Sequence, residues 1–169
     1  FEDSRILHIA EDDGVQMALH FGDPEQELRR KRNIELHAAT ERGDVEAMQA
    51  LIAQGADVNG RADSLGNVAA REGHVCALEV LLENGFEVNT TSESHGGSAL
   101  VEAATYGQVE FVRRLLAITG IDLRLTEDEK TALDWARSPE PHAEVSEEHG
   151  EIVAMLEAAE RGIFPVLGS

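Results

Sequence analysis

Aromatic residues, basic residues and cysteine are all scarce in this chain of 169 residues. Aromatic side chains make up only 4% of the residues, so we expect a core of leucine, valine, isoleucine and alanine between closely spaced elements. No run of about eighteen apolar residues is present, and we therefore expect no membrane-spanning helix. The single Cys76 excludes an internal disulfide and favours a reducing compartment. We expect a cytoplasmic protein. Because the chain begins with Phe1 rather than methionine, a removed signal peptide with periplasmic or secreted localisation stays open.

The shortage of positive charge restricts the classes of partner. Fourteen basic residues face thirty-three acidic ones, and the formal net charge is -19. This charge disfavours nucleic acids and anionic membranes, since both require a basic surface on the protein. It favours a protein partner with a basic surface, although the alternative is that it serves solubility alone. The four basic residues 29–32 are interpreted as the cationic end of a helix, with a localisation signal as the alternative.

The motifs of common catalytic sites are missing. The sequence contains no P-loop, no G-x-G-x-x-G after a strand, no G-x-S-x-G and no H-E-x-x-H. His142 and His149 lie in an acidic segment with Glu144, Glu147 and Glu148, but their spacing fits no known metal site. We therefore expect no catalytic residue, no cofactor and no bound metal, and an enzyme that uses this acidic segment ranks last among the function hypotheses.

A segment of about thirty residues recurs along the chain. The clearest copy, LHAATERGDVEAMQALIAQGADVN, runs from Leu36 to Asn59. A second copy ends with GHVCALEVLLENGFEVN at Asn89, a third reads SALVEAATYGQVEFVRRLLAITGIDL over residues 98–123, and a fourth opens with KTALDWAR at Lys130. Such a period is typical of solenoids, in which each unit packs only against its neighbours.

Each copy predicts two short helices. The first, Leu36 to Arg42, is rich in alanine and ends at Gly43, and the second ends at Gly55, because a glycine after the last turn suits a left-handed cap. Neither helix can bury its apolar face alone, so neighbouring copies must stack, with Leu81 buried between two helix pairs. The apolar face of one second helix consists of Val45, Met48, Leu51 and Ile52. The alanines that allow close helix packing are Ala38, Ala39, Ala69, Ala70, Ala103 and Ala104.

These copies resemble the ankyrin-repeat family, whose period is roughly 33 residues and whose signature is T-P-L-H-x-A. The segment Leu36-His37-Ala38-Ala39 keeps the L-H-x-A part, and Thr131-Ala132-Leu133 keeps the hydroxyl and the leucine. The second copy has Leu65-Gly66-Asn67 at this place, which is a poor match. The resemblance implies an all-α solenoid of stacked helix–turn–helix units, joined by extended β-turn or hairpin loops.

We expect one continuous domain with an atypical N-terminal end. Leu7-His8-Ile9-Ala10 copies the first-helix pattern, and Pro24 to Asn33 predicts a polar helix with Asp23 as its N-cap. The loop 138–149 of the fourth copy is either a binding element or a tolerated surface insertion. The three expected parts are an N-terminal capping segment (1–33), four repeats (34–162) and an apolar C-terminal tail (163–169).

The resemblance implies protein binding. Ankyrin proteins bind other proteins through their turns and the exposed face of each first helix, which together form a concave surface. Carried onto this sequence, the first-helix positions are Asp12, Asp13, Glu41, Arg42, Arg71, Glu72, Thr105 and Tyr106. The turn positions are Ser94, His95, Glu127, Asp128 and Lys130, with Arg61 and Asp63 in a turn that is shortened. Tyr106 is the only aromatic residue among them, and tyrosine is enriched at binding hot spots.

Two function hypotheses lead. The first is a non-catalytic interaction module that binds a protein partner through the concave face. The second is a stoichiometric inhibitor or immunity protein that blocks a partner enzyme, with an acidic face or the loop 138–149 entering a basic active site. We expect a monomer when no partner is bound.

Overall fold

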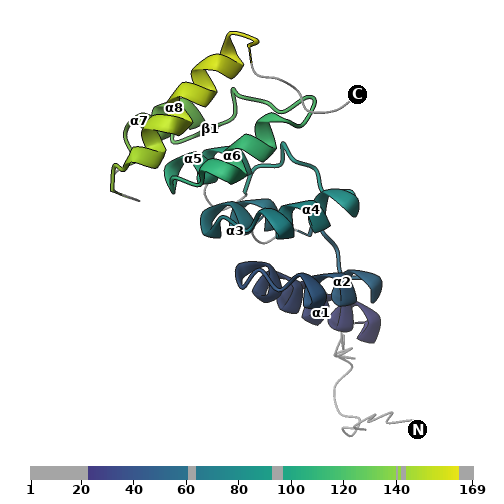
Figure 1. Cartoon of the computed structure of the whole chain (residues 1–169). Coiled ribbons are helices and arrows are strands. Elements are labelled where there is room, and N and C mark those ends of the chain that lie inside the picture. The colour runs from purple at the N-terminus through teal and green to yellow at the C-terminus, as the bar shows by residue number, and fades with distance from the viewer. Residues whose placement is uncertain (1–22, 61–63, 93–96, 140, 142–143, 164–169) are drawn as a thin grey trace, which may run out of the picture.

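The computed structural model describes residues 23–60, 64–92, 97–139, 141 and 144–163. Within them the chain forms eight helices in four consecutive pairs. The pairs stack in chain order into an elongated solenoid, with α1 and α2 at one end and α7 and α8 at the other (Figure 1). The helices are α1 (Pro24–Glu41), α2 (Val45–Ala53), α3 (Leu65–Glu72), α4 (Val75–Glu83), α5 (Ala99–Thr105), α6 (Val109–Leu116), α7 (Ala132–Arg137) and α8 (Glu147–Glu160).

The expected all-α solenoid is therefore confirmed, and its loops carry the only strands of the described residues. Strands β1 (Thr126–Glu127) and β2 (Lys130–Thr131) form a short antiparallel hairpin between the third and fourth pairs. A single β-bridge joins Thr91 to Ser98 between the second and third pairs. None of the described helices is both long and apolar enough to cross a bilayer.

Alanines and leucines form the contacts between pairs. Ala39, Ala69 and Ala103 are fully buried, and first helices of neighbouring pairs pack directly on one another. Leu81 is also fully buried, as the repeat pattern predicts. Small side chains at these positions allow helix axes to approach closely, so little aromatic volume is needed to fill the core.

The end of each first helix is the point where two pairs meet. Gly43 follows α1 with a φ of +66°. Directly after it, the backbone N of Asp44 donates to the carbonyl of Ala39 at 2.9 Å and so satisfies one carbonyl at the end of the helix. The imidazole of His74 lies over this glycine, at 2.9 Å from the place a Cβ would occupy. Its Nε2 donates to the carbonyl of Glu41 at 3.1 Å. Gly43 is thus required twice, for its backbone conformation and for the space above it.

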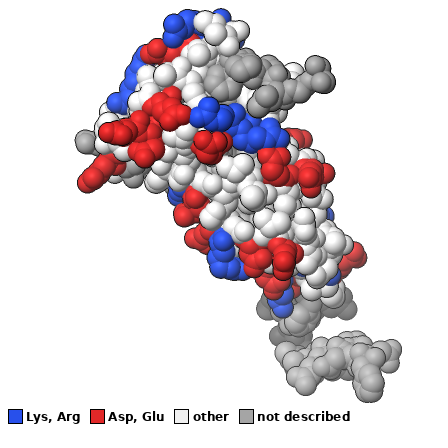
Figure 2. All heavy atoms as spheres, viewed as in Figure 1, with Lys and Arg blue, Asp and Glu red and all other residues white. Residues whose placement is uncertain are grey.

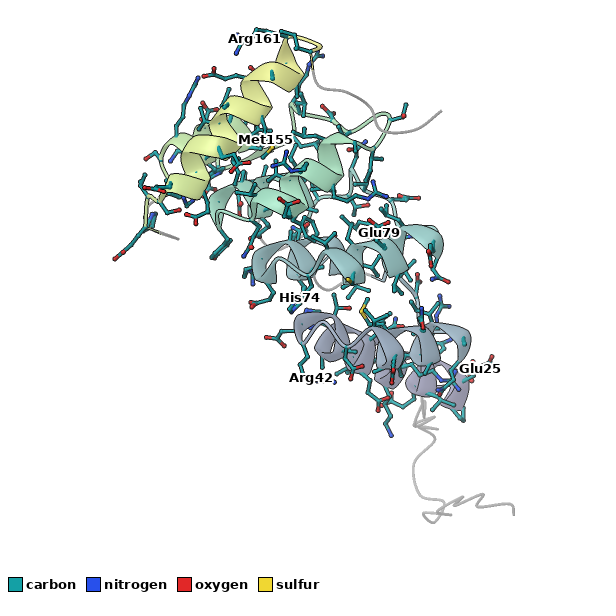
Figure 3. All side chains as sticks on the ribbon, in the orientation of Figure 1. Glu25, Arg42, His74, Glu79, Met155 and Arg161 are labelled. Carbon is teal, nitrogen blue, oxygen red and sulfur yellow. The ribbon has the colours of Figure 1, made fainter. Side chains whose placement is uncertain are left out.

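The same contact recurs at the next two junctions. Gln108 lies over Gly73 and donates from Nε2 to the carbonyl of Arg71 at 2.9 Å. His149 in α8 donates from Nε2 to the carbonyl of Thr105 at 3.0 Å. In each case one polar side chain of the following pair satisfies a carbonyl at the end of the preceding first helix, which that helix cannot satisfy itself. Figure 3 shows His74 at the first of these junctions.

Asparagines join the turns at the opposite ends of the pairs. Asn59 accepts from the backbone N of Glu87 and donates to the carbonyl of Gly85, both at 3.0 Å. Asn89 makes the same two bonds one repeat later, to Asp122 N and Gly120 O, both at 2.9 Å. Each asparagine side chain thereby replaces a peptide group that would otherwise pair the two turns.

Two helix boundaries differ from those expected from the sequence. The chain from Pro24 to Glu41 is a single helix of 18 residues, whereas the sequence predicted a polar helix to Asn33 and a separate one from Leu36. No glycine or proline interrupts it after Pro24, so nothing ends the helix before Arg42. Asn33 instead accepts from the backbone N of Asp57 at 2.9 Å. Helix α8 begins at Glu147, so His149 lies inside its first turn.

The poor signature of the second copy has a packing explanation. Gly66 stands where the first and third copies have Leu36 and Leu100, counted from the glycine that ends each first helix. The ring of Phe86 fills the missing volume, because a Cβ on Gly66 would lie 2.4 Å from the Phe86 Cζ. In the first copy the residue equivalent to Phe86 is Ala56. In the second pair, a turn residue therefore fills the space that a first-helix leucine fills in the first pair.

This exchange predicts strong coupling between the two positions. Gly66→Leu should destabilise the fold by about 1–3 kcal/mol through overpacking, and Phe86→Ala by about 3–5 kcal/mol through a cavity. The double variant should lose at least about 1 kcal/mol less than the sum, since the leucine fills the space that the ring left. Urea denaturation measures all three. As a control, the losses of stability from Leu156→Ala on α8 and from Gly66→Leu should add in the double variant. If the losses from Phe86→Ala and Gly66→Leu add in the same way, the two positions do not share one space.

Candidate partner-binding face

Five of the expected binding residues lie in a row along one edge of the solenoid. Because His74 and Gln108 each contact the end of the preceding first helix, the C-terminal ends of α1, α3 and α5 are aligned. Arg42 is exposed there on the first pair, close to the junction at His74 (Figure 3). We call this row the helix-end row; it consists of Glu41, Arg42, Arg71, Glu72 and Tyr106.

Arg71 of the helix-end row contacts both an acidic and an aromatic side chain of the next pair. Its guanidinium donates to both carboxylate oxygens of Glu102, at 3.2 Å and 3.4 Å. The same guanidinium lies 5.8 Å from the centre of the Tyr106 ring. Glu102 is only 6% exposed, so its charge is compensated almost entirely by Arg71. Tyr106 is half-buried and caps the end of α5.

Sequence reasoning missed Glu102. It is a charged residue in an otherwise apolar stretch of α5, and it follows Arg71 by 31 residues, close to one repeat period. A basic and an acidic residue one period apart on first helices are placed side by side by the stacking. That spacing was the signal that could have identified the pair.

Thr105 is a correction to the expected binding set. The sequence placed it on the exposed face, but it is only 3% exposed. Its hydroxyl donates to the carbonyl of Val101 at 2.8 Å, and its own carbonyl accepts from His149. It lies one residue before Tyr106, and this single step around the helix turns the side chain from the surface into the interface between two pairs.

The other described candidates lie in the hairpin, at the opposite ends of the first helices. Helix α7 begins directly after β2, so the hairpin adjoins the N-terminal end of a first helix. The indole Nε1 of Trp135 donates to the carbonyl of Glu127 at 3.1 Å, and the Lys130 Nζ lies 4.1 Å from the Trp135 ring. Lys130 therefore serves to hold the hairpin on α7. Asp128 is exposed at the tip.

The hairpin tip has an unusual backbone. Asp128 and Glu129 have φ values of 49° and 64°, a region that two-residue hairpin turns require and that glycine or asparagine usually occupies. Two acidic side chains are held outward in this conformation at a cost of about 1–2 kcal/mol for each.

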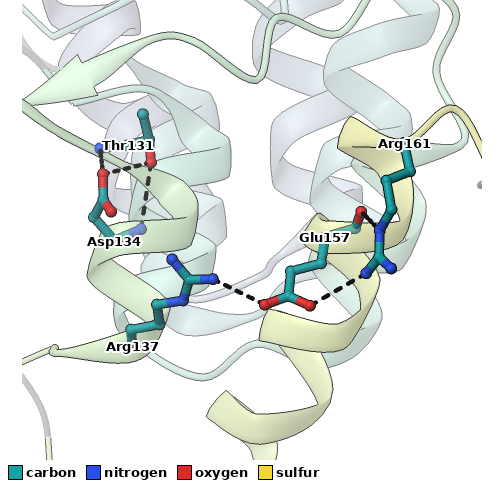
Figure 4. Close-up of polar contacts among 5 residues, drawn as sticks. All are labelled: Thr131, Asp134, Arg137, Glu157 and Arg161. Atoms are coloured by element: carbon teal, nitrogen blue, oxygen red, sulfur yellow. Dashed lines mark hydrogen bonds and ion pairs between the residues drawn. The ribbon is translucent and has the colours of Figure 1, made fainter.

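Polar contacts fix the junction between the hairpin and α7. Asp134 accepts from the backbone N and the hydroxyl of Thr131 at 3.0 and 2.8 Å (Figure 4). These hydrogen bonds from Thr131 hold the pKa of the Asp134 carboxyl below its ordinary value. Since a lowered pKa favours the charged form in the folded state, this contribution to stability is present above the ordinary pKa of an aspartate and is lost as the pH falls below it.

Six arginines of the described residues form ion pairs with carboxylates of the solenoid. Between pairs, Arg71 binds Glu102, Arg114 binds Glu79 and Arg113 binds Glu151. Within the last pair, Glu157 joins two arginines (Figure 4). The carboxylate of Glu79 raises the pKa of Arg114 through its hydrogen bond. Figure 2 accordingly shows most basic groups of that face beside acidic ones, with acidic side chains along the whole stack.

An open groove lies at the C-terminal end, between the turn after α6 and the end of α8. Its volume is about 690 Å³. The side chain of Arg124 stands where the two preceding turns carry Asn59 and Asn89, so the asparagine contacts between turns stop there. The groove is lined by Asn89, Gly120, Ile121, Asp122, Leu123, Arg124, Thr131, Ala159 and Glu160.

Several expected residues are not placed by the structure. Asp12, Asp13, Ser94, His95, Arg61 and Asp63 lie outside the described residues, as does His142. His149 is buried, and its Nδ1 accepts from Ser146 N at 3.2 Å, so both ring nitrogens contact the protein. In the described part of the chain, no three His, Cys, Asp or Glu side chains are grouped to hold a metal ion.

Comparison with known families gives two matches. The family described as "Ankyrin repeats (3 copies)" matches residues 66–156, and the family described as "Ankyrin repeat" matches residues 33–63. Together they include all four helix pairs except the first half of α1, the first residue of α3 and the last turn of α8. No curated protein matches the chain.

The contact between Arg71 and Glu102 predicts unequal effects of two arginine substitutions. Arg71→Ala should cost about 1–3 kcal/mol of stability, because a buried carboxylate loses its hydrogen bonds. Arg113→Ala removes exposed ion pairs with Glu110 and Glu151, in which the side chain of Arg113 is 45% exposed and those of the glutamates are 74% and 53% exposed, and should cost about 0–1 kcal/mol. Chemical denaturation compares them. An equal loss for both variants would mean that the burial of Glu102 gives the contact with Arg71 no additional stability.

Proposed function

The chain belongs to the ankyrin-repeat family, whose repeats serve as protein–protein interaction modules, and on that premise we propose how it binds. It is a non-catalytic module that takes a protein partner on its concave face. The helix-end row forms one border of the binding surface and the hairpin tip at Asp128 the other. The observation that carries this proposal is the exposed Arg71 held over Tyr106 at the middle of the stack.

The pair of Arg71 and Tyr106 has the properties of a binding anchor. Arginine and tyrosine are residue types enriched at hot spots. Arg71 is already ordered by Glu102, so a partner that contacts it loses less side-chain freedom on binding than it would with a free arginine. The Arg71 side chain is 44% exposed, so part of it is accessible to a partner.

The charge of the protein supports a partner with a basic surface. Net charge is -19, and many of the arginines are occupied by contacts inside the solenoid. Exposed carboxylates at Glu41, Glu72 and Asp128 stand on the proposed surface beside the exposed Arg42 and Arg71. Such a field raises the rate of encounter with a positively charged protein.

The second candidate is a stoichiometric inhibitor or immunity protein that blocks an enzyme with a basic active site. The acidic hairpin tip favours it, because Asp128 and Glu129 are held outward in a strained turn. The two functions share one binding surface and differ in the partner. Affinity capture followed by mass spectrometry identifies that partner, and an activity assay of it with one equivalent of this protein separates an inhibitor from an adaptor.

Substitution of Tyr106 tests the proposed surface. Tyr106→Ala should weaken binding of the captured partner by at least about 1–2 kcal/mol, as truncation of a hot-spot residue does. Its stability should change by less than about 1 kcal/mol, since the ring is only half-buried. Titration calorimetry and melting curves measure the two effects. Cys76→Ser, at an exposed position on α4, is the control that should change neither. Unchanged affinity of Tyr106→Ala would move the binding surface away from the third repeat.

Salt should slow association with the partner. Screening acts over about 8–10 Å at physiological ionic strength and reduces the long-range attraction between opposite charges. The association rate measured by stopped flow should therefore fall steeply from low to high salt, while the dissociation rate changes little. A rate that stays constant would show that the acidity serves solubility and does not guide the partner.

A further inference from the structure

The basic run 29–32 lies in the middle of α1 and not at its end. Helix α1 extends from Pro24 to Glu41, and its last turn carries no basic residue. The interpretation of these bases as the cationic end of a helix is therefore wrong, because the helix dipole acts only on the first and last turns. Arg29 and Arg32 also stand three residues apart, a spacing at which like charges repel one another. The basic run thus needs another explanation.

Only part of the basic run is used inside the solenoid. Arg29 binds Asp57 in the turn after α2, with 2.9 Å between guanidinium and carboxylate, and Arg32 is half-buried. Arg30 and Lys31 are exposed. Within the described residues, the side chains of these two bases form neither an ion pair nor a hydrogen bond. Their charges are therefore available to another molecule.

Acidic neighbours on α1 explain only part of this arrangement. Glu27 and Glu35 stand four residues before and after Lys31, the spacing at which opposite charges stabilise an isolated helix. In the part of the chain that the structure describes, neither glutamate forms an ion pair with Lys31. This spacing accounts for a solvated helix surface, but it does not account for the apolar side chains beside the bases.

Two apolar residues adjoin the unpaired bases. Leu28 is 48% and Ile34 is 64% exposed, and they are two of the four large apolar residues that are exposed in the described chain. Lys31 stands three residues from each of them, so the three side chains are neighbours on the helix surface. Apolar side chains bordered by polar ones are typical of interaction sites. We call this surface the α1 patch; it consists of Leu28, Arg30, Lys31 and Ile34.

We propose that the α1 patch binds an acidic segment of a second protein. Apolar side chains of that segment cover Leu28 and Ile34, and its carboxylates pair with Arg30 and Lys31. The α1 patch lies on the first pair, at one end of the stack (Figure 1). Helices pack about 8–10 Å apart, so the acids of the third and fourth pairs lie beyond a Debye length of about 8 Å. They are too distant to repel an acidic segment at the patch.

A protein segment is favoured over the other acidic occupants. Nucleic acids and anionic membranes present extended rows of negative charge and bind to larger groups of bases, whereas the patch offers Arg30 and Lys31 alone. The net charge of -19 repels both, and it also repels a second copy of the chain. The proposal is independent of the proposed function. Together the two would describe an adaptor that joins a basic partner to an acidic one.

Peptide binding to the full chain tests this proposal. The probe is a labelled helical peptide of about four turns, with leucines along one face and glutamates beside them, and fluorescence anisotropy measures its affinity. Lys31→Glu should weaken binding at least about tenfold, and so should a peptide with glutamine in place of each glutamate. Arg124→Glu is the matched control, because it makes the same change of charge at an exposed base of the third turn. No measurable binding to the wild type, or equal losses for both variants, would overturn the proposal.

Two further measurements separate the alternative occupants. If vesicles of anionic phospholipid bind the wild type and not Lys31→Glu, the patch belongs to a membrane and the proposal fails. It also fails if sedimentation shows a wild-type dimer that Lys31→Glu dissociates, since the occupant is then a second copy. Affinity for the partner of the concave face should be unchanged in Lys31→Glu, so this proposal and the proposed function fail separately. Melting curves confirm that each variant is folded.

Discussion

The stack depends on one contact that recurs at the ends of the first helices α1, α3 and α5. A glycine in the left-handed conformation follows each of these helices, and a side chain of the next pair lies on that glycine and donates to a carbonyl at the helix end. The contact sets the distance between pairs, because any side chain on the glycine would push the neighbour away. It also fixes their rotation, since the donor must meet one particular carbonyl. The alignment of the helix-end row follows from this contact.

Much of the solenoid could be predicted from the sequence, because glycines and alanines are placed by backbone requirements. Gly43 and Gly55 were expected to end helices, and both have positive φ. The continuous α1 was not predicted, although residues 25–41 contain no glycine or proline that would end a helix. Gly66 was seen only as a poor match, because its compensation lies twenty residues away at Phe86.

The candidate site was harder to predict than the fold. Thr105 and Tyr106 are neighbours, and only the observed end of α5 shows which one reaches the surface. Lysine is a residue type that is usually exposed, yet Lys130 lies over the ring of Trp135 and helps to hold the hairpin on α7. Glu102 joins the site through Arg71 of another pair. The roles of Thr105 and Glu102 depend on contacts between pairs, whereas the sequence pattern describes one pair at a time.

The exchange between Gly66 and Phe86 has a consequence for how such arrays change over time. Both residues belong to the second pair, so the pair carries its own compensation wherever it is placed. Duplication or recombination at repeat boundaries could therefore move this unit without loss. Single substitutions face a different situation, since either residue changed alone leaves a hole or a clash. Exchange of whole repeats thus offers this unit an evolutionary route that stepwise substitution does not.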